Sequence, residues 1–360
     1  MTLLIDELPK NPKILLVRLD GIGDLICLTP AIVALRQRFP DAQIDVLVNE
    51  YNGEILRDHP AINHLLIDYR TRDRHTDRRR PLQSFKGWWQ RMRMRQQHYD
   101  VAIAAHFGIH ARSLWWVRQI RPKHIIQSVE PEWVSAWNDG AINIPAIWGC
   151  HETQATYKLL EPLGIHGQPG PLSLSLNQVE AETFTRSLRT EFPPTAKLVG
   201  LNITASVAER RWPIHAFIEL AKSLRGQFPE VIWVPIWLPN LSGGSPYGQT
   251  PGDDEALYVF QQAFPAEAIR TIRTDSLQAL LMLLAACDLL VTSDGGVLHM
   301  AAALQKPIVG LFQSLTEKTM RWYPWGVPHI LVQAERLSAP VNEIRVVEVT
   351  KAVKNLLETI

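Results

Sequence analysis

Short apolar strands alternate with helical segments twice along the 360-residue chain, and this alternation limits the possible folds more than any single motif. In the first half, four segments have the apolar character of buried parallel strands: residues 13–19, 43–48, 62–67 and 101–105. A β-α-β rhythm of this kind predicts a parallel sheet with helices on both faces. The sequence therefore predicts an α/β protein whose first half is Rossmann-like.

The second half repeats the pattern after a stretch rich in Gly, Pro and Ser at residues 165–197, which is typical of a linker. Strands are expected at residues 198–203 and 231–237 and in a segment that ends at Ser293, and an amphipathic helix ends the chain. Two such domains facing each other create a cleft at the carboxyl ends of their strands, where α/β proteins bind ligands. The predicted boundaries are residues 1–170, 171–340 and, for the terminal helical segment, 341–360.

Composition argues against several classes of protein. The net charge is +1, so nothing attracts the chain as a whole to nucleic acid or acidic lipid. The longest apolar stretches, such as residues 277–284, fall well below the ~20 residues needed to cross a bilayer, and the N-terminus does not resemble a signal peptide. Three scattered cysteines, Cys27, Cys150 and Cys287, lack metal-binding spacing. We expect a cytoplasmic protein with reduced thiols and no metal.

The first motif is the turn after the first strand, in RLDGIGDLICLTPAI. Gly21 and Gly23 would let the backbone approach a ligand closely, but Ile26 stands where a dinucleotide fingerprint needs its third glycine. Glu50 is a weak candidate for the acidic residue that should close the second strand. An acidic residue at a helix start also disfavours a pyrophosphate there. Asp24 therefore suits either a helix cap or a carboxylate that accepts a proton or hydrogen bonds from hydroxyls.

Pro30 leaves two possible starts for the helix that follows this turn. Either Asp24 caps the helix and Pro30 kinks it, or Thr29 caps a shorter helix with Pro30 at its first position. Because Leu25 and its apolar neighbours continue the apolar face, we favour a helix from Asp24 to Arg38.

The second motif, SDGGVLHMAAALQKPIVGLF, places a turn between a buried strand and a helix of small residues. Gly295 and Gly296 leave backbone N–H groups at the helix start, which favours a diphosphate site. Asp294 can either accept hydrogen bonds from sugar hydroxyls or cap the helix. His299 lies in the first turn or two, where it either faces a ligand or is satisfied within the protein.

Together, VRLDGIGDLICLTPAIVALRQRFP and SDGGVLHMAAALQKPIVGLF resemble the heptosyltransferase family, glycosyltransferase family nine. HETQATYKLLEPLGI and GLNITASVAERRWP resemble family segments in the same order, so the resemblance covers residues 13–330. It implies a GT-B fold, with an acceptor domain, a donor domain and a last helix that packs back on the first. It also implies inverting, metal-independent transfer of a sugar, typically heptose from an ADP-activated donor, onto a lipopolysaccharide-core acceptor. The ADP-sugar is then a co-substrate, and no cofactor is expected.

The resemblance also assigns roles to residues. Asp24 matches the general base that takes the proton of the acceptor hydroxyl, and Arg210 matches a cation that stabilises the departing diphosphate. The matching donor-binding residues are Thr204, Asp294, Gly295, Gly296 and His299, and the acceptor-binding ones are Gly21, Gly23, His106 and Arg112. The family more often has lysine at position 210, and we expect the neighbouring Arg211 to be solvated.

A basic segment at residues 70–98 carries ten Lys and Arg residues against two Asp. It is either a solvated loop or a surface for a phosphorylated sugar, a membrane or, less favourably, single-stranded nucleic acid. We expect an anionic glycolipid or saccharide acceptor, peripheral membrane contact and no nucleic acid. An NAD(P)-linked oxidoreductase and a catalytically silent nucleotide-sugar binding protein remain as alternative functions.

Overall fold

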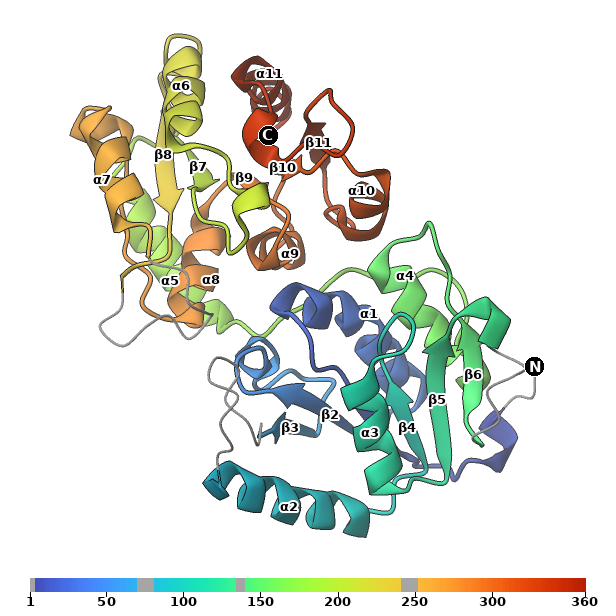
Figure 1. Ribbon diagram of the computed structural model, residues 1–360. Helices are drawn as coiled ribbons and strands as arrows, with labels where there is room; N and C mark the ends of the chain where they lie inside the picture. Colours follow the sequence, from blue (N-terminus) through green and yellow to red (C-terminus); the bar gives the residue numbers. More distant parts are fainter. Residues whose placement is uncertain (1–3, 70–80, 134–139, 241–251) are drawn as a thin grey trace. The chain divides into compact units, whose positions relative to one another are not determined.

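The computed structural model describes residues 4–69, 81–133, 140–240 and 252–360, which belong to two compact units (Figure 1). The units are Met1–Ser175 and Leu176–Ile360, so the division falls five residues after the predicted one. Each unit contains one parallel sheet with helices around it. No helix in the described ranges is long and apolar enough to cross a membrane.

The first unit is built on a six-stranded parallel sheet in the order β3-β2-β1-β4-β5-β6. Its strands are β1 (Lys13–Val17), β2 (Gln43–Asn49), β3 (His64–Asp68), β4 (Val101–Ala104), β5 (His124–Val129) and β6 (Ile142–Pro145). Its helices are α1 (Ile22–Arg38), α2 (Pro81–Gln96), α3 (Ala111–Ile120) and α4 (Glu152–Tyr157). The strand order reverses between β1 and β4, so the usual ligand position of such sheets lies at the carboxyl ends of these two strands.

The second unit has a five-stranded parallel sheet in the order β11-β10-β9-β7-β8. Its strands are β7 (Lys197–Asn202), β8 (Val231–Ile236), β9 (Leu289–Ser293), β10 (Ile308–Phe312) and β11 (His329–Gln333). Its helices are α5 (Gln178–Arg189), α6 (Ile214–Arg225), α7 (Asp254–Gln262), α8 (Leu277–Ala286), α9 (Gly296–Ala303), α10 (Thr316–Trp322) and α11 (Val346–Leu357). Here the order reverses between β7 and β9, which is the corresponding ligand position.

The last helix, α11, belongs to the core of the second unit. Val349 and Val353 of α11 are fully buried in the same apolar cluster as Leu220 of α6 and Val309 of β10. Packing of this helix on the first domain would be a contact between the two units, and it stays a prediction. The apolar stripe of α11 was visible in the sequence, but a stripe does not specify which sheet covers it.

The first helix, α1, begins at Ile22 with Gly21 as its N-cap, two residues before the predicted start. Pro30 lies inside the helix, where a proline removes the hydrogen bond that would reach the carbonyl four residues earlier. That carbonyl belongs to Ile26, and the buried hydroxyl of Thr29 donates to it at 2.6 Å. Thr29 therefore satisfies the group that Pro30 leaves open, and the alternative in which Thr29 caps a shorter helix is wrong.

Candidate functional site

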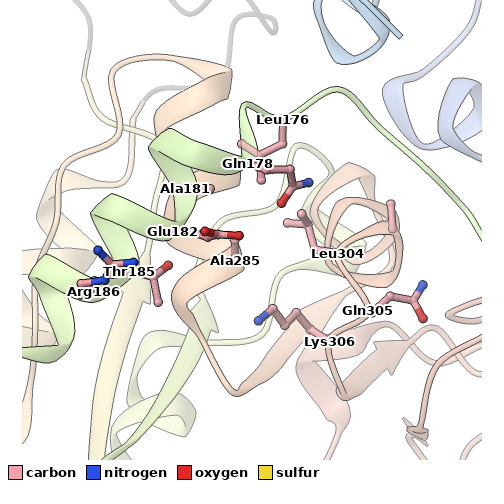
Figure 2. Close-up of a pocket in the computed structure, with 11 residues that line it drawn as sticks. Leu176, Gln178, Ala181, Glu182, Thr185, Arg186, Ala285, Leu304, Gln305 and Lys306 are labelled. Atoms are coloured by element: carbon pink, nitrogen blue, oxygen red, sulfur yellow. The ribbon is translucent and has the colours of Figure 1, made fainter. Parts of the chain in front are cut away.

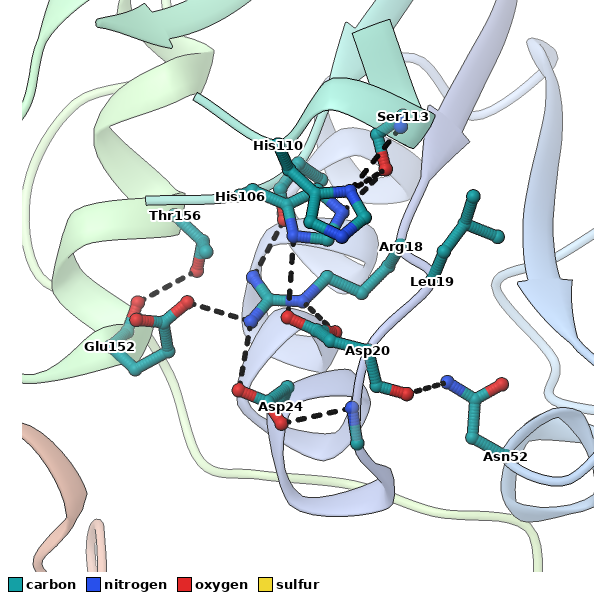
Figure 3. A network of polar contacts seen from close by, with 12 residues as sticks. Arg18, Leu19, Asp20, Asp24, Asn52, His106, His110, Ser113, Glu152 and Thr156 are labelled. Atoms are coloured by element: carbon teal, nitrogen blue, oxygen red, sulfur yellow. Dashed lines mark hydrogen bonds and ion pairs between the residues drawn. The ribbon is translucent and has the colours of Figure 1, made fainter. Parts of the chain in front are cut away.

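A buried arginine organises the ligand end of the first sheet. Arg18 follows β1, and its Nη1 donates to the carbonyl of Ala105, just after β4, at 2.6 Å. Its Nε lies 2.7 Å from Asp20 Oδ1. Its Nη2 lies 2.8 Å from Glu152 Oε1 and 3.2 Å from Asp24 Oδ1 (Figure 3). One guanidinium thus joins the ends of the two switch-point strands and gathers three carboxylates around it.

The backbone of the turn that contains Asp20 is also held by several hydrogen bonds. The carbonyl oxygen of Asp20 accepts hydrogen bonds from Asn49 Nδ2, Tyr51 Oη and Asn52 Nδ2 at 2.8, 2.7 and 2.9 Å. All three donors follow or end β2, the neighbouring strand. Because three donors fix the position of one carbonyl group, the turn that carries the acidic residues has a defined position before any ligand arrives.

Asp24 is the third residue of α1, and not its cap as the sequence analysis expected. Its Oδ2 accepts the N–H of Gly21 at 3.0 Å, while Oδ1 contacts Arg18. A Cβ atom at Gly21 would lie 2.5 Å from Asp24 Oδ2, so glycine is needed there for the carboxylate to approach the backbone. The Asp24 side chain is 26% exposed, which leaves part of the carboxylate open to solvent.

Two neighbouring carboxyls in this cluster have opposite pKa shifts. Burial raises the pKa of Asp24 to about 6, and the charge of Asp20 adds to the rise while Arg18 opposes it. Burial also favours neutral Asp20, but Arg18 and His106 together outweigh it and hold the pKa of Asp20 below its ordinary value. Such a separation is typical of paired groups with different chemical roles. At neutral pH Asp24 is largely ionised and able to accept a proton.

His106, a predicted acceptor-binding residue, lies inside the cluster. Its Nδ1 is 3.2 Å from Asp20 Oδ2, and its Nε2 is 2.6 Å from the hydroxyl of Ser113 (Figure 3). The ring stacks on His110 with centroids 4.0 Å apart. Burial lowers the pKa of His106 to about 4, so the imidazole is neutral at neutral pH. Both ring nitrogens contact protein groups, and a contact with an acceptor stays a prediction.

The other predicted acceptor residues lie around the same sheet edge. Gly23 is buried in the first turn of α1. Arg112, in α3, forms a two-pronged ion pair with the buried Asp68 at the end of β3, with Nε–Oδ2 and Nη2–Oδ1 distances of 2.5 and 2.7 Å. Its side chain is therefore already oriented by a protein carboxylate. Residues 70–80 of the basic segment lie outside the described residues.

The second sheet brings the Gly-rich turn and a cation together. β9 ends at Ser293, as predicted, and the helix α9 begins at Gly296, the last residue of the predicted turn. Gly295 is its N-cap, so the alternative in which Asp294 caps the helix is wrong. Arg210 Nη1 donates to the Asp294 carbonyl at 3.3 Å and lies 3.4 Å from Asp294 Oδ2. The first N–H groups of an α-helix lack intrahelical acceptors. This edge of the sheet thus combines a helix N-terminus with an adjacent guanidinium, a suitable arrangement for an anion.

Two further predicted donor residues are engaged within the protein. The Thr204 hydroxyl donates to Asp253 Oδ2 at 2.5 Å, and the other oxygen of Asp253 pairs with Arg211. Arg211 also donates to the Ala205 carbonyl at 2.9 Å, so this side chain, which is 36% exposed, is anchored to the protein while it stays partly solvated. His299 is buried in α9, with its ring 5.9 Å from the ring of Trp322. Donor contacts by Thr204 and His299 stay predictions.

Sequence reasoning missed Arg18, Asp20 and Glu152. The first two were present in the opening motif as charged residues directly after an apolar strand, a position where burial requires a partner. Glu152 follows the His151 N-cap of α4 and is fully buried. Nothing in the neighbouring sequence indicated that this carboxylate would be fully buried. Within the described residues, no group of three or more His, Cys, Asp or Glu side chains could hold a metal ion.

A cavity of about 690 Å³ lies elsewhere in the second unit (Figure 2). Residues of α5, α8 and the end of α9 line it, together with Lys306, which precedes β10. Its lining includes none of the predicted site residues. Because ligands of open α/β sheets bind at the carboxyl ends of strands, a cavity before the amino end of β10 is not the candidate site.

Comparisons with known proteins identify the family and the fold. The family described as Glycosyltransferase family 9 (heptosyltransferase) matches residues 89–344. Lipopolysaccharide heptosyltransferase 2 of Escherichia coli is 34% identical over 105 residues, which are 29% of this chain and only 27% of that protein. Lipopolysaccharide heptosyltransferase 1 of Pseudomonas aeruginosa is 27% identical over 308 residues, 83% of this chain and 78% of that protein.

A solved structure is similar over nearly the whole chain. Escherichia coli heptosyltransferase WaaC with ADP has a TM-score of 0.69 at 17% identity, covering 96% of this chain and 99% of that one. At this identity the likeness concerns the fold. The predicted class, GT-B with two Rossmann-like parallel-sheet domains, is confirmed.

Proposed function

The chain belongs to glycosyltransferase family 9, and from this premise we propose that it transfers heptose from ADP-heptose onto a lipopolysaccharide-core saccharide. The transfer is inverting and needs no metal ion. Asp24 is the general base, and the second unit binds the donor diphosphate. The proposal includes a cytoplasmic location with peripheral contact to a membrane.

The main support for this proposal is the position and the pKa of the Asp24 carboxylate. It lies at the switch point of the first sheet, is oriented by Arg18 and the Gly21 amide, and has a pKa near 6. A base with a pKa close to the working pH is both ionised and able to hold a proton. Asp20, whose pKa is lowered, remains an anion that contacts Arg18 and keeps the guanidinium in place.

The reaction follows from these groups. The oxygen of the acceptor hydroxyl attacks the anomeric carbon of the donor sugar, and Asp24 takes the hydroxyl proton. The bond between that carbon and the diphosphate oxygen breaks, and ADP leaves with the bonding electrons. Arg210 and the first amides of α9 stabilise the charge that develops on the diphosphate. This positive charge is why the proposal requires no metal.

Donor binding is tested by thermal shift with ADP-, GDP- and UDP-sugars and with NAD. A ligand at a 100-fold excess over its Kd adds about 2.7 kcal/mol to stability, which is easily measured. We expect ADP-heptose to raise the Tm and NAD to leave it unchanged. A response to NAD without a response to any nucleotide sugar would favour the oxidoreductase alternative.

Transfer is tested with ADP-heptose and a purified core acceptor that lacks heptose. We expect a heptosylated product of inverted anomeric configuration by NMR, at a rate that EDTA does not change. The matched control is Asp24→Asn, which should bind the donor normally and form little product. Donor binding without product from any core acceptor would favour the silent binding protein.

A further inference from the structure

Large aromatic side chains are exposed on one side of the first unit. Trp88 and Trp89 of α2 are 48% and 52% exposed, and Trp115 of α3 is 42% exposed. Helices α2 and α3 pack against each other, and α2 lies at the outside of the unit (Figure 1). Contiguous exposed aromatic surface is unusual in a soluble protein and marks an interaction site.

The exposed residues of α2 form one continuous helical face. Trp88 and Met92 are four residues apart, as are Trp89 and Arg93, so the two pairs lie side by side along the helix. All four are exposed, whereas Met94, on the opposite face, is buried in the core of the first unit. The helix therefore uses its other face for packing and presents Trp88, Trp89 and Met92 outward.

The two helices that carry this face have charged side chains of one sign only. Neither α2 nor α3 contains an Asp or Glu residue. Arg91, Arg93 and Arg95 follow the tryptophans along α2, and the guanidinium of Arg91 lies 5.2 Å from the ring of Trp115. Since the whole chain has a net charge of only +1, this is a local concentration of positive charge.

We propose that this face, made of Trp88, Trp89, Met92 and Arg93 of α2 with Trp115 and Arg91 beside them, docks the protein on an anionic lipid surface. Tryptophan and arginine side chains suit the boundary between headgroups and acyl chains, because each has an apolar body and a polar end. Each basic residue near an anionic leaflet contributes about 1 kcal/mol. The face supplies the membrane contact in the proposed function, but it does not depend on the transfer reaction.

The geometry favours lipid over single-stranded nucleic acid, the other partner for arginine and aromatic residues. Nucleic-acid platforms stack bases on open aromatic faces. Here Trp88 and Trp89 meet edge to face, at 84° with centroids 5.7 Å apart, and Arg91 lies over Trp115. Met92, one helical turn after Trp88, offers apolar contact without a stacking face.

The test is co-sedimentation of the full chain with phosphatidylcholine vesicles with and without phosphatidylglycerol. We expect binding to the anionic vesicles that weakens as salt rises. Trp88→Ala/Trp89→Ala should lower the partition coefficient at least about tenfold, and Arg91→Glu/Arg93→Glu should remove its salt dependence. Trp148→Ala removes an exposed tryptophan from the loop between β6 and α4, away from both helices, and should leave the partition coefficient unchanged.

The Tm of each variant and its shift with ADP-heptose report folding and donor binding separately from membrane binding. A loss of vesicle binding with an unchanged donor shift supports the docking face, whatever the outcome of the transfer assay. Equal binding of the double tryptophan variant and the wild type would overturn it. Displacement of the protein from vesicles by an oligonucleotide that itself binds through Trp88 and Trp89 would assign the face to nucleic acid instead.

Discussion

In the first unit the arginine that follows the first strand is enclosed, whereas the arginine beside the Gly-rich turn of the second unit is partly open. The side chain of Arg18 is 2% exposed and contacts three carboxylates. The side chain of Arg210 is 27% exposed and contacts Asp294 at 3.3 and 3.4 Å. Both lie at the switch points of their sheets, so position alone does not explain the difference.

The difference in burial indicates that the two arginines have different roles. A buried guanidinium with several carboxylates would be costly to move, because each charge depends on the others for compensation. Arg18 therefore keeps Asp24 in place. Arg210 has long contacts and access to solvent, so it can exchange Asp294 for the oxygens of a diphosphate at small cost. The first site is set before binding, and the second is able to adapt to its ligand.

Replacing the base tests the first site most severely. Asp24→Asn keeps the size of the side chain and an acceptor for the Gly21 amide, but it cannot take a proton. We expect kcat to fall by about 10² to 10⁴, with the ADP-heptose thermal shift unchanged. Full activity in this variant would mean that Asp24 only stabilises the start of α1.

The second site is tested by removing its cation. Arg210→Ala should reduce kcat by about 10² to 10³, the usual loss when one donor to a developing negative charge is removed. Arg210→Lys should recover part of the rate, since a point charge replaces the two-pronged guanidinium. Arg211→Ala is the control: because Arg211 holds Asp253, we expect it to lower the Tm and to change kcat less. Equal rate losses at both positions would contradict the role of Arg210.

The electrostatic coupling inside the first site predicts a pH shift. The Asp20 charge raises the pKa of Asp24, so Asp20→Asn should lower that pKa and move the acid limb of the kcat profile to lower pH. Asp100→Asn is a matched control, since Asp100 pairs with Lys123 at the amino end of β4. A profile that does not move, or that moves to higher pH, would show that Asp20 does not act on the base.

The smallest effect concerns stability. Because folding raises the pKa of Asp24 from its ordinary value to about 6, the folded protein loses stability as pH rises through that interval. Asparagine carries no such penalty, so Asp24→Asn should gain stability relative to the wild type above pH 6, by at most on the order of 3 kcal/mol. Below pH 4 the difference should disappear. Thermal melts of both proteins across pH measure it, and a difference independent of pH would contradict the raised pKa.

Much of the fold could be predicted from local signals. The predicted strand that ends at Ser293 is present, and the predicted helix after it begins at Gly296, the last residue of the predicted turn. The helix predicted to start at Asp24 begins two residues earlier, because Gly21 provides the cap and the Asp24 carboxylate reaches back to its amide. The sequence pattern placed Asp24 in the turn after the first strand, and the structure has it at the start of α1. The chemical roles that the family resemblance gave to Asp24 and Arg210 stay predictions.

Apolar runs and glycine turns are local features that involve residues close together in the sequence. The amino-acid sequence by itself therefore determines where strands end and where helices begin. The partners of a buried charge depend on the whole fold. Arg18 meets Asp20 and Asp24 because they are close in sequence, but it meets Ala105, 87 residues away, and Glu152 only because β1 and β4 are adjacent and α4 packs against α1. The same holds for α11, whose apolar stripe could cover either sheet. Folding decides such choices, because the free energy of a buried charge or apolar face depends on what surrounds it in space.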